Sequence, residues 1–150
     1  MKAEKGFMMK KNLFKLVWFV FPLTKLVYAF LAYSQHKEIN NAFELTSILL
    51  MGIGIIACAV SIFLSKKIYK KSFLENKTVS MFVGSRASDN ESKTFALFTM
   101  LLGLAESAAL FGFVQYLLTG NLIAGIILYV FCFVAWLFNY PSAAESEEDE

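Results

Sequence analysis

The sequence has few of the side chains that proteins use for chemistry in water. It holds one histidine, two cysteines and two prolines among 150 residues. His36 has no cysteine or carboxylate cluster beside it, which argues against a metal site. Cys58 and Cys132 each lie within an apolar run, where we expect small packing residues rather than a disulfide or a metal pair. With no nucleophile–base pair and no glycine loop for phosphate, we predict that the protein is not an enzyme and holds no cofactor or metal.

Apolar residues make up the bulk of the chain. They reach 57% of the composition, aromatic residues reach 16%, and the mean hydropathy is +0.57. The apolar residues come in runs of about 20, the length that crosses a bilayer as a helix. We therefore predict one integral membrane domain over 1–150, an all-α four-helix transmembrane bundle that meets lipid and not nucleic acid. The expected spans are 13–33, 43–64, 95–118 and 122–140.

Positive charge is distributed unevenly between the loops. Five lysines precede or begin the first span, and six lysines and Arg86 fall in the loop 65–94. The loop after the first span has only Lys37, and the turn 119–121 has no basic residue. Because basic loops stay in the cytoplasm, we expect both termini there and antiparallel hairpins between neighbouring spans. We expect a bacterial inner (plasma) membrane, with the first span retained and a solvated acidic tail over 141–150.

One carboxylate lies inside the third apolar run. Glu106 sits near the middle of 95–118, in the stretch GLAESAALFG of 103–112. A charged carboxylate at the bilayer centre costs about 3 kcal/mol on insertion scales. Such a group is retained when it is neutral, paired or functional, so Glu106 is the principal candidate site.

Small residues occur around this carboxylate and in the second span. Small side chains let helix backbones approach closely, which drives helix association in lipid. We expect the small residues to pack helices, within this chain or against other transmembrane helices or a second copy. They are Gly52 and Gly54 in the second span, and Gly103, Ala105, Ala109 and Gly112 in the third.

The stretch from Gly103 to Val114 resembles the second helix of the c subunit (proteolipid) of rotary ATP synthases. That helix carries its acid in a motif like A-E-x-x-x-x-F/Y-G-L-V, and Arg86 falls where the family has a loop arginine. The resemblance covers the hairpin of the second and third spans. It implies proton handling by Glu106, with Ser107 beside it, Arg86 as a loop contact, and an oligomer.

The chain also departs from that family. The second span lacks a long glycine repeat, Ala87 and Ser88 follow Arg86, and the first and fourth spans have no counterpart in the two-helix subunit. Ala108 and Phe111 stand where sodium-binding members have hydroxyl residues. If an ion binds, the resemblance therefore implies a proton rather than sodium.

Lys25 offers a second interpretation of Glu106. It lies near the middle of the first span, and the expected topology places it at the depth of Glu106. The two would then form a structural ion pair in an accessory membrane protein that packs against partner helices. Both hypotheses, the proton site and the structural pair with Lys25 as counter-charge, remain open from the sequence.

Overall fold

Helices make up all the regular structure in the part of the chain that is described. The structure, a computed structural model, describes residues 2–35, 38–40, 42–83 and 90–141, and shows no strand among them. The side chains of 2–11 and of Phe82 are not described. The helices are α1 (Lys2–Ser34), α2 (Leu45–Ser65), α3 (Lys71–Leu74), α4 (Lys77–Val83), α5 (Asn90–Thr119) and α6 (Leu122–Phe138).

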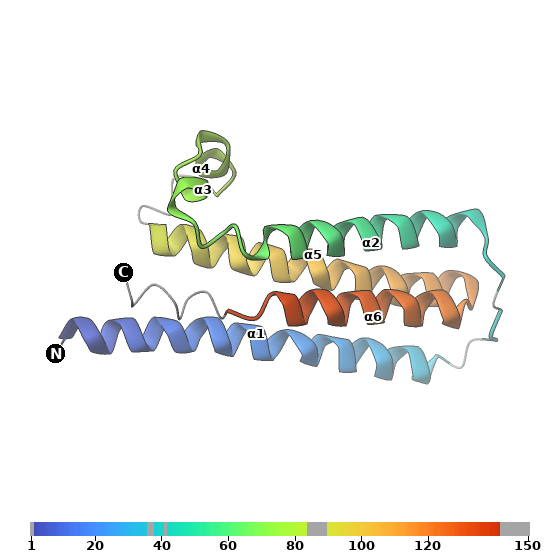
Figure 1. The fold of residues 1–150 in the computed structure, drawn as a ribbon. Helices are drawn as coiled ribbons and strands as arrows, with labels where there is room; N and C mark the ends of the chain where they lie inside the picture. Colours follow the sequence, from blue (N-terminus) through green and yellow to red (C-terminus); the bar gives the residue numbers. More distant parts are fainter. Residues whose placement is uncertain (1, 36–37, 41, 84–89, 142–150) are drawn as a thin grey trace.

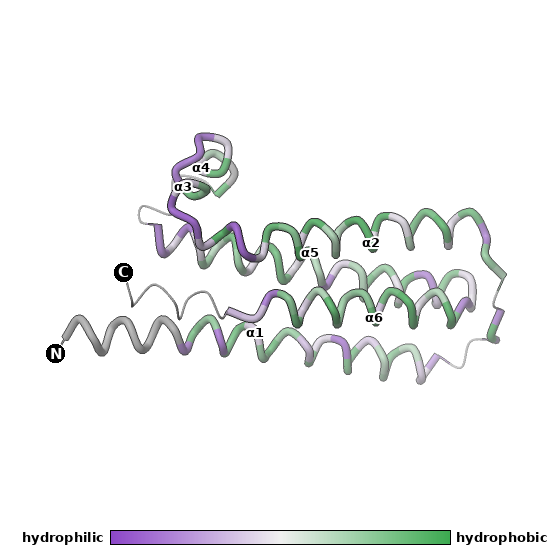
Figure 2. The backbone as a smooth tube through the Cα atoms, in the orientation of Figure 1, coloured by the Kyte–Doolittle hydropathy of each residue, from purple (hydrophilic) through white to green (hydrophobic). Residues whose placement is uncertain are grey.

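The four long helices α1, α2, α5 and α6 lie side by side, and the short helices α3 and α4 sit at one end (Figure 1). Apolar residues run along all four, while polar residues gather at the end with α3 and α4 (Figure 2). Three helices are long and apolar enough to cross a bilayer: Asn12–Ser34 of α1, Leu45–Ser65 and Asn90–Thr119. The chain is a membrane protein on these grounds. The apolar α6, with 17 residues, reaches only about 25 Å at 1.5 Å per residue.

Two of the long helices extend beyond the predicted spans. α1 begins at Lys2 rather than at 13, and α5 begins at Asn90 rather than at 95. The region expected as one loop over 65–94 also contains α3, α4 and the start of α5. A hydropathy run marks where a helix enters lipid, whereas polar residues such as lysine and glutamate continue a helix into water at little cost. Arg86 lies outside the described residues.

The most tightly packed part of the bundle joins α2, α5 and α6 through small side chains. Ala105, Ala108 and Ala109 of α5 are fully buried there with Leu128 and Cys132 of α6. Gly54 allows the closest approach of α2, because a Cβ at this position would stand 2.6 Å from Leu128 Cδ2. Small residues let the backbones of transmembrane helices approach closely, and this close approach supplies the van der Waals packing that holds helices together in lipid.

Two glycines expected at helix contacts lie elsewhere. Gly52 and Gly103 are exposed, and a Cβ added to either meets no heavy atom within 4 Å. The prediction that these two glycines pack helices within this chain was wrong, because their Cα hydrogens face the open sides of α2 and α5. The small-residue pattern does not say which side of a helix a neighbour occupies.

The turn between α5 and α6 requires glycine. Gly120 has φ of 71°, and a Cβ there would lie 2.3 Å from the carbonyl oxygen of Glu38. Asn121 then caps α6: its side chain accepts from Ala124 N at 2.9 Å and donates to Ala42 O at 2.9 Å. The α5–α6 turn and the α1–α2 connection are therefore held together at one end of the bundle.

α1 packs mainly on α5 and leaves most of its apolar side chains exposed, as a lipid-facing helix does. A tryptophan pair also joins it to α6. Pro22 has no N–H, so the carbonyl of Trp18 one turn earlier lacks its helical donor. Trp136 Nε1 donates to this oxygen at 2.9 Å, and Trp18 Nε1 donates to Trp136 O at 2.9 Å. The two rings stack with centroids 4.0 Å apart, which closes α1 against α6 at this level.

Candidate functional site

Lys25 and Glu106 form an ion pair between α1 and α5. Lys25 Nζ donates to Glu106 Oε2, and the two side chains are only 11% and 12% exposed. Both residues lie well inside helices that are able to cross a bilayer. Pairing opposite charges at this depth removes the net charge that would otherwise have to be buried in lipid. The carboxylate is therefore not presented to lipid on its own.

Both oxygens of the Glu106 carboxylate have partners. The hydroxyl of Thr24 donates to Oε1, and the Cys132 thiol lies 3.8 Å from Oε2. Since a carboxylate accepts but cannot donate, donors on three sides suit its ionised form. α1 supplies two of them from consecutive residues and α6 supplies the third, so the carboxylate links three helices.

Thr24 can also exchange its partner. Its single hydroxyl hydrogen faces two acceptors, Glu106 Oε1 and the Phe21 carbonyl oxygen at 2.6 Å. When Glu106 is ionised, Thr24 donates to it. If Glu106 held a proton, the acid could donate to Thr24, which would then donate to Phe21 O. The site can therefore hold either form of the acid without losing a hydrogen bond at Thr24.

Aromatic contacts between α1 and α5 lie on both sides of the ion pair along the helices. Tyr28, one turn after Lys25, stacks on Phe113 of α5 with ring centroids 5.5 Å apart. Toward the other end, Phe14 meets Phe95 and Phe98, each with centroids 5.1 Å apart. These contacts bracket the ion pair on both sides, so α1 is held at three levels on α5.

Ser107, also predicted for the site, bonds to its own helix rather than to the pair. The Ser107 hydroxyl donates at 2.7 Å to Leu104 O on its own helix. Its role in ion binding stays a prediction, as does the loop contact of Arg86, which is outside the described part.

A buried polar connection was missed from the sequence. Asn139 Nδ2 donates to Ser61 Oγ at 2.8 Å, and Ser61 Oγ donates to Leu101 O at 2.8 Å, which joins α6, α2 and α5. Asn139 follows the end of α6 and Ser61 lies within α2, and nothing in the sequence links the two. Ser47 and Gln115 are also fully buried, and their side-chain polar atoms have no protein partner.

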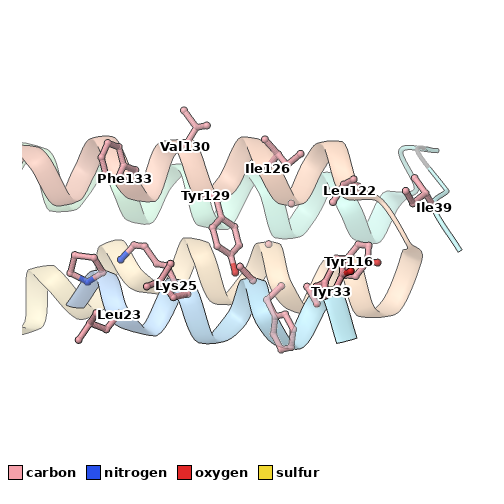
Figure 3. A pocket seen from close by; sticks show the side chains of 17 residues that line it. Leu23, Lys25, Tyr33, Ile39, Tyr116, Leu122, Ile126, Tyr129, Val130 and Phe133 are labelled. Carbon is pink, nitrogen blue, oxygen red and sulfur yellow. The ribbon is translucent and has the colours of Figure 1, made fainter. Parts of the chain in front are cut away.

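A groove opens beside the ion pair, between α1 and α6 over a floor of α5, with a volume of about 940 Å³. Figure 3 shows Lys25 toward one end of it, Tyr129 extending from α6 into its middle, and Tyr33 and Tyr116 toward the other end. Its lining is almost entirely apolar. Gly112 and Gly125 line the groove where α5 and α6 touch, because a Cβ at Gly112 would stand 3.0 Å from Gly125 O.

No group of three or more histidine, cysteine or acidic side chains in the described ranges could hold a metal ion. Cys58 and Cys132 are both buried and free.

Comparisons with protein-family models, with curated proteins and with solved structures found no match for this chain. The resemblance of 103–114 to the ATP synthase c subunit is therefore untested by relatives.

Proposed function

We propose that the chain is an accessory membrane protein, a four-helix transmembrane bundle with both termini in the cytoplasm, in which Lys25 and Glu106 form a structural pair. The observation that carries this proposal is the pair itself, in which both carboxylate oxygens have donors and little of either side chain is exposed. A proton carrier of the c-subunit type needs an acid that alternates between lipid and an aqueous path. A fully paired carboxylate is suited instead to hold α1 on α5.

The four-span topology has support from charge and from geometry. The start of α1 and the end of α6 lie at the same end of the bundle as α3 and α4 (Figure 1). That end carries the basic segment, with Lys66, Lys67 and Lys70 after α2, and the opposite end has the turn 119–121 without a basic residue. Basic residues favour the cytoplasmic side.

Partner helices are the expected binding surface of such a protein. Gly52 on α2 and Gly103 on α5 lie on faces that no other part of the described chain covers. Exposed glycines in lipid-facing helices permit the close approach of another helix. This supports an accessory role in which the bundle packs against other transmembrane segments.

Proton handling at Glu106 is the second candidate function. The observation that favours it is the hydroxyl of Thr24, which can follow the acid between its two protonation states.

Proton flux into liposomes distinguishes the two candidates. The purified protein would be reconstituted with an internal pH dye, and flux driven by a potassium diffusion potential with valinomycin. We expect flux no greater than in protein-free liposomes, because the paired carboxylate does not exchange with water. Flux that the wild-type protein raises and Glu106→Gln abolishes would overturn the structural proposal in favour of the second candidate.

A further inference from the structure

The groove between α1 and α6 has the dimensions of a ligand site. Its volume of about 940 Å³ lies within the range of about 300–1,000 Å³ that small-molecule sites occupy. Along α6 it runs from Leu122 to Phe133, a length of about 16 Å at 1.5 Å per residue. That length is about half the thickness of a bilayer's hydrocarbon core. A molecule within it would lie at the depth of one leaflet, with one end near the ion pair.

The charges of the lining favour a ligand that accepts hydrogen bonds. Among the described residues that line the groove, Lys25 is the only charged side chain, and no carboxylate is present. The Lys25 ammonium has three N–H donors, of which Glu106 Oε2 takes one and Phe21 O, at 3.4 Å, takes another. Tyr129 adds a phenolic donor. An acceptor placed here would meet a cationic donor in an apolar setting, where such bonds are strong.

The same lining disfavours a charged ligand and a helix. Since Glu106 already neutralises Lys25, an anion would place a second negative charge beside one ammonium in lipid. A helix is about 10 Å across with its side chains, and the Tyr129 ring projects into the space it would need (Figure 3). A flat, neutral ring fits better, because the Tyr129, Phe113 and Phe133 rings offer aromatic faces and edges.

We propose that this groove binds a neutral lipophile with a ring head and carbonyl acceptors, the chemical class of the isoprenoid quinones. Its carbonyl accepts from Lys25 Nζ at the inner end, its ring lies among Tyr129, Phe113 and Phe133, and its tail leaves along α1 past Ala29 and Ala32. The proposal concerns binding and includes no redox step. It goes beyond the accessory function, and the groove can bind or stay empty whether or not Glu106 carries protons.

The test is saturable quenching of tryptophan fluorescence by decylubiquinone, with the full chain in nanodiscs. Trp18 and Trp136 are the only tryptophans of the sequence. Trp136 is the expected reporter of binding, because its ring centroid lies 5.3 Å from that of Phe133, which lines the groove. We expect saturable quenching that Ala29→Phe, which fills the groove, weakens at least about tenfold in apparent affinity, the equivalent of one good contact. Ala59→Phe, on the exposed face of α2, is the matched control and should leave the affinity within about twofold.

Two further measurements test the role of the lysine. The variant Lys25→Met/Glu106→Gln keeps the site neutral but removes the cationic donor, and we expect a loss of about tenfold in affinity. Decylbenzene, with a ring and tail but no carbonyl, should compete poorly with decylubiquinone. Absence of saturable quenching, no change with Ala29→Phe, or decylbenzene competing as well as the quinone would each overturn the proposal.

Discussion

Glu106→Gln and Lys25→Met should each destabilise the bundle, while the double variant should recover most of the loss. Removing one partner leaves an unpaired buried charge, which costs about 3–5 kcal/mol. Glu106→Gln is expected to lower the free energy of unfolding by an amount at the upper end of this range, since it leaves the Lys25 ammonium facing a neutral amide. Lys25→Met is expected to cost less, since the Glu106 carboxylate keeps its contacts with the Thr24 hydroxyl and the Cys132 thiol. Unfolding in mixed micelles by increasing SDS fraction, monitored by circular dichroism, measures each variant and the coupling energy.

The chain has its own control for this cycle. Lys71 and Glu75 lie 3.8 Å apart at the exposed end of the molecule, with side chains 78% and 58% exposed. An ion pair in water contributes little, so the cycle Lys71→Met/Glu75→Gln should show coupling well below about 1 kcal/mol. Equal coupling in the two cycles, or none between Lys25 and Glu106, would contradict the assignment of a structural role to the intramembrane pair.

Gly112→Leu should destabilise the bundle far more than Gly103→Leu, although both positions lie in α5. A Cβ at Gly112 would stand 3.0 Å from Gly125 O and 3.2 Å from Leu128 Cβ, so a larger side chain must push α6 away. Overpacking of this kind costs about 1–3 kcal/mol and sometimes more. The same SDS unfolding assay measures this loss of stability and the accompanying loss of native helix packing.

Gly103 is the matched control because a Cβ there meets nothing within 4 Å. Leucine is a better helix former than glycine, by about 0.5–1 kcal/mol, so Gly103→Leu should be neutral or stabilising in isolated protein. If Gly103→Leu were the more damaging of the two, the placement of α6 against Gly112 would be incorrect. If Gly103→Leu were harmless to the isolated protein but reduced its association in membranes, the open face of α5 would be a partner interface.

Sequence patterns predicted the helical class and most of the apolar boundaries, because a bilayer demands long uncharged helices. Lys25 and Glu106 could be matched by depth, since each is the strongest polar interruption of its own span. The Thr24 hydroxyl, which also donates to the carboxylate, could not be found this way, because hydroxyl residues are common in apolar helices. Neither could the link between Asn139 and Ser61, which depends on the rotation of α6 relative to α2.

The rotation of α2 about its axis also explains why Gly52 does not contact a neighbouring helix. Gly52 and Gly54 stand two residues apart, about 200° around a helix, so both cannot face one neighbour. Only Gly54 faces α5 and α6, and the sequence does not indicate which of the two glycines does so. The carbonyl freed by Pro22 was identifiable in principle, but its partner Trp136 comes from a helix distant in the sequence.

The most direct test of the buried pair is carbodiimide labelling of Glu106 in native membranes across a range of pH, located by mass spectrometry. The reagent modifies a protonated and accessible carboxyl group in an apolar setting. Because Lys25 and Thr24 occupy the carboxylate, we predict no labelling of Glu106 in the wild-type protein at any pH, and labelling once Lys25→Met removes its partner. Strong labelling of the wild-type protein near neutral pH that fades as the pH rises would contradict the structural pair and indicate a titrating acid open to lipid.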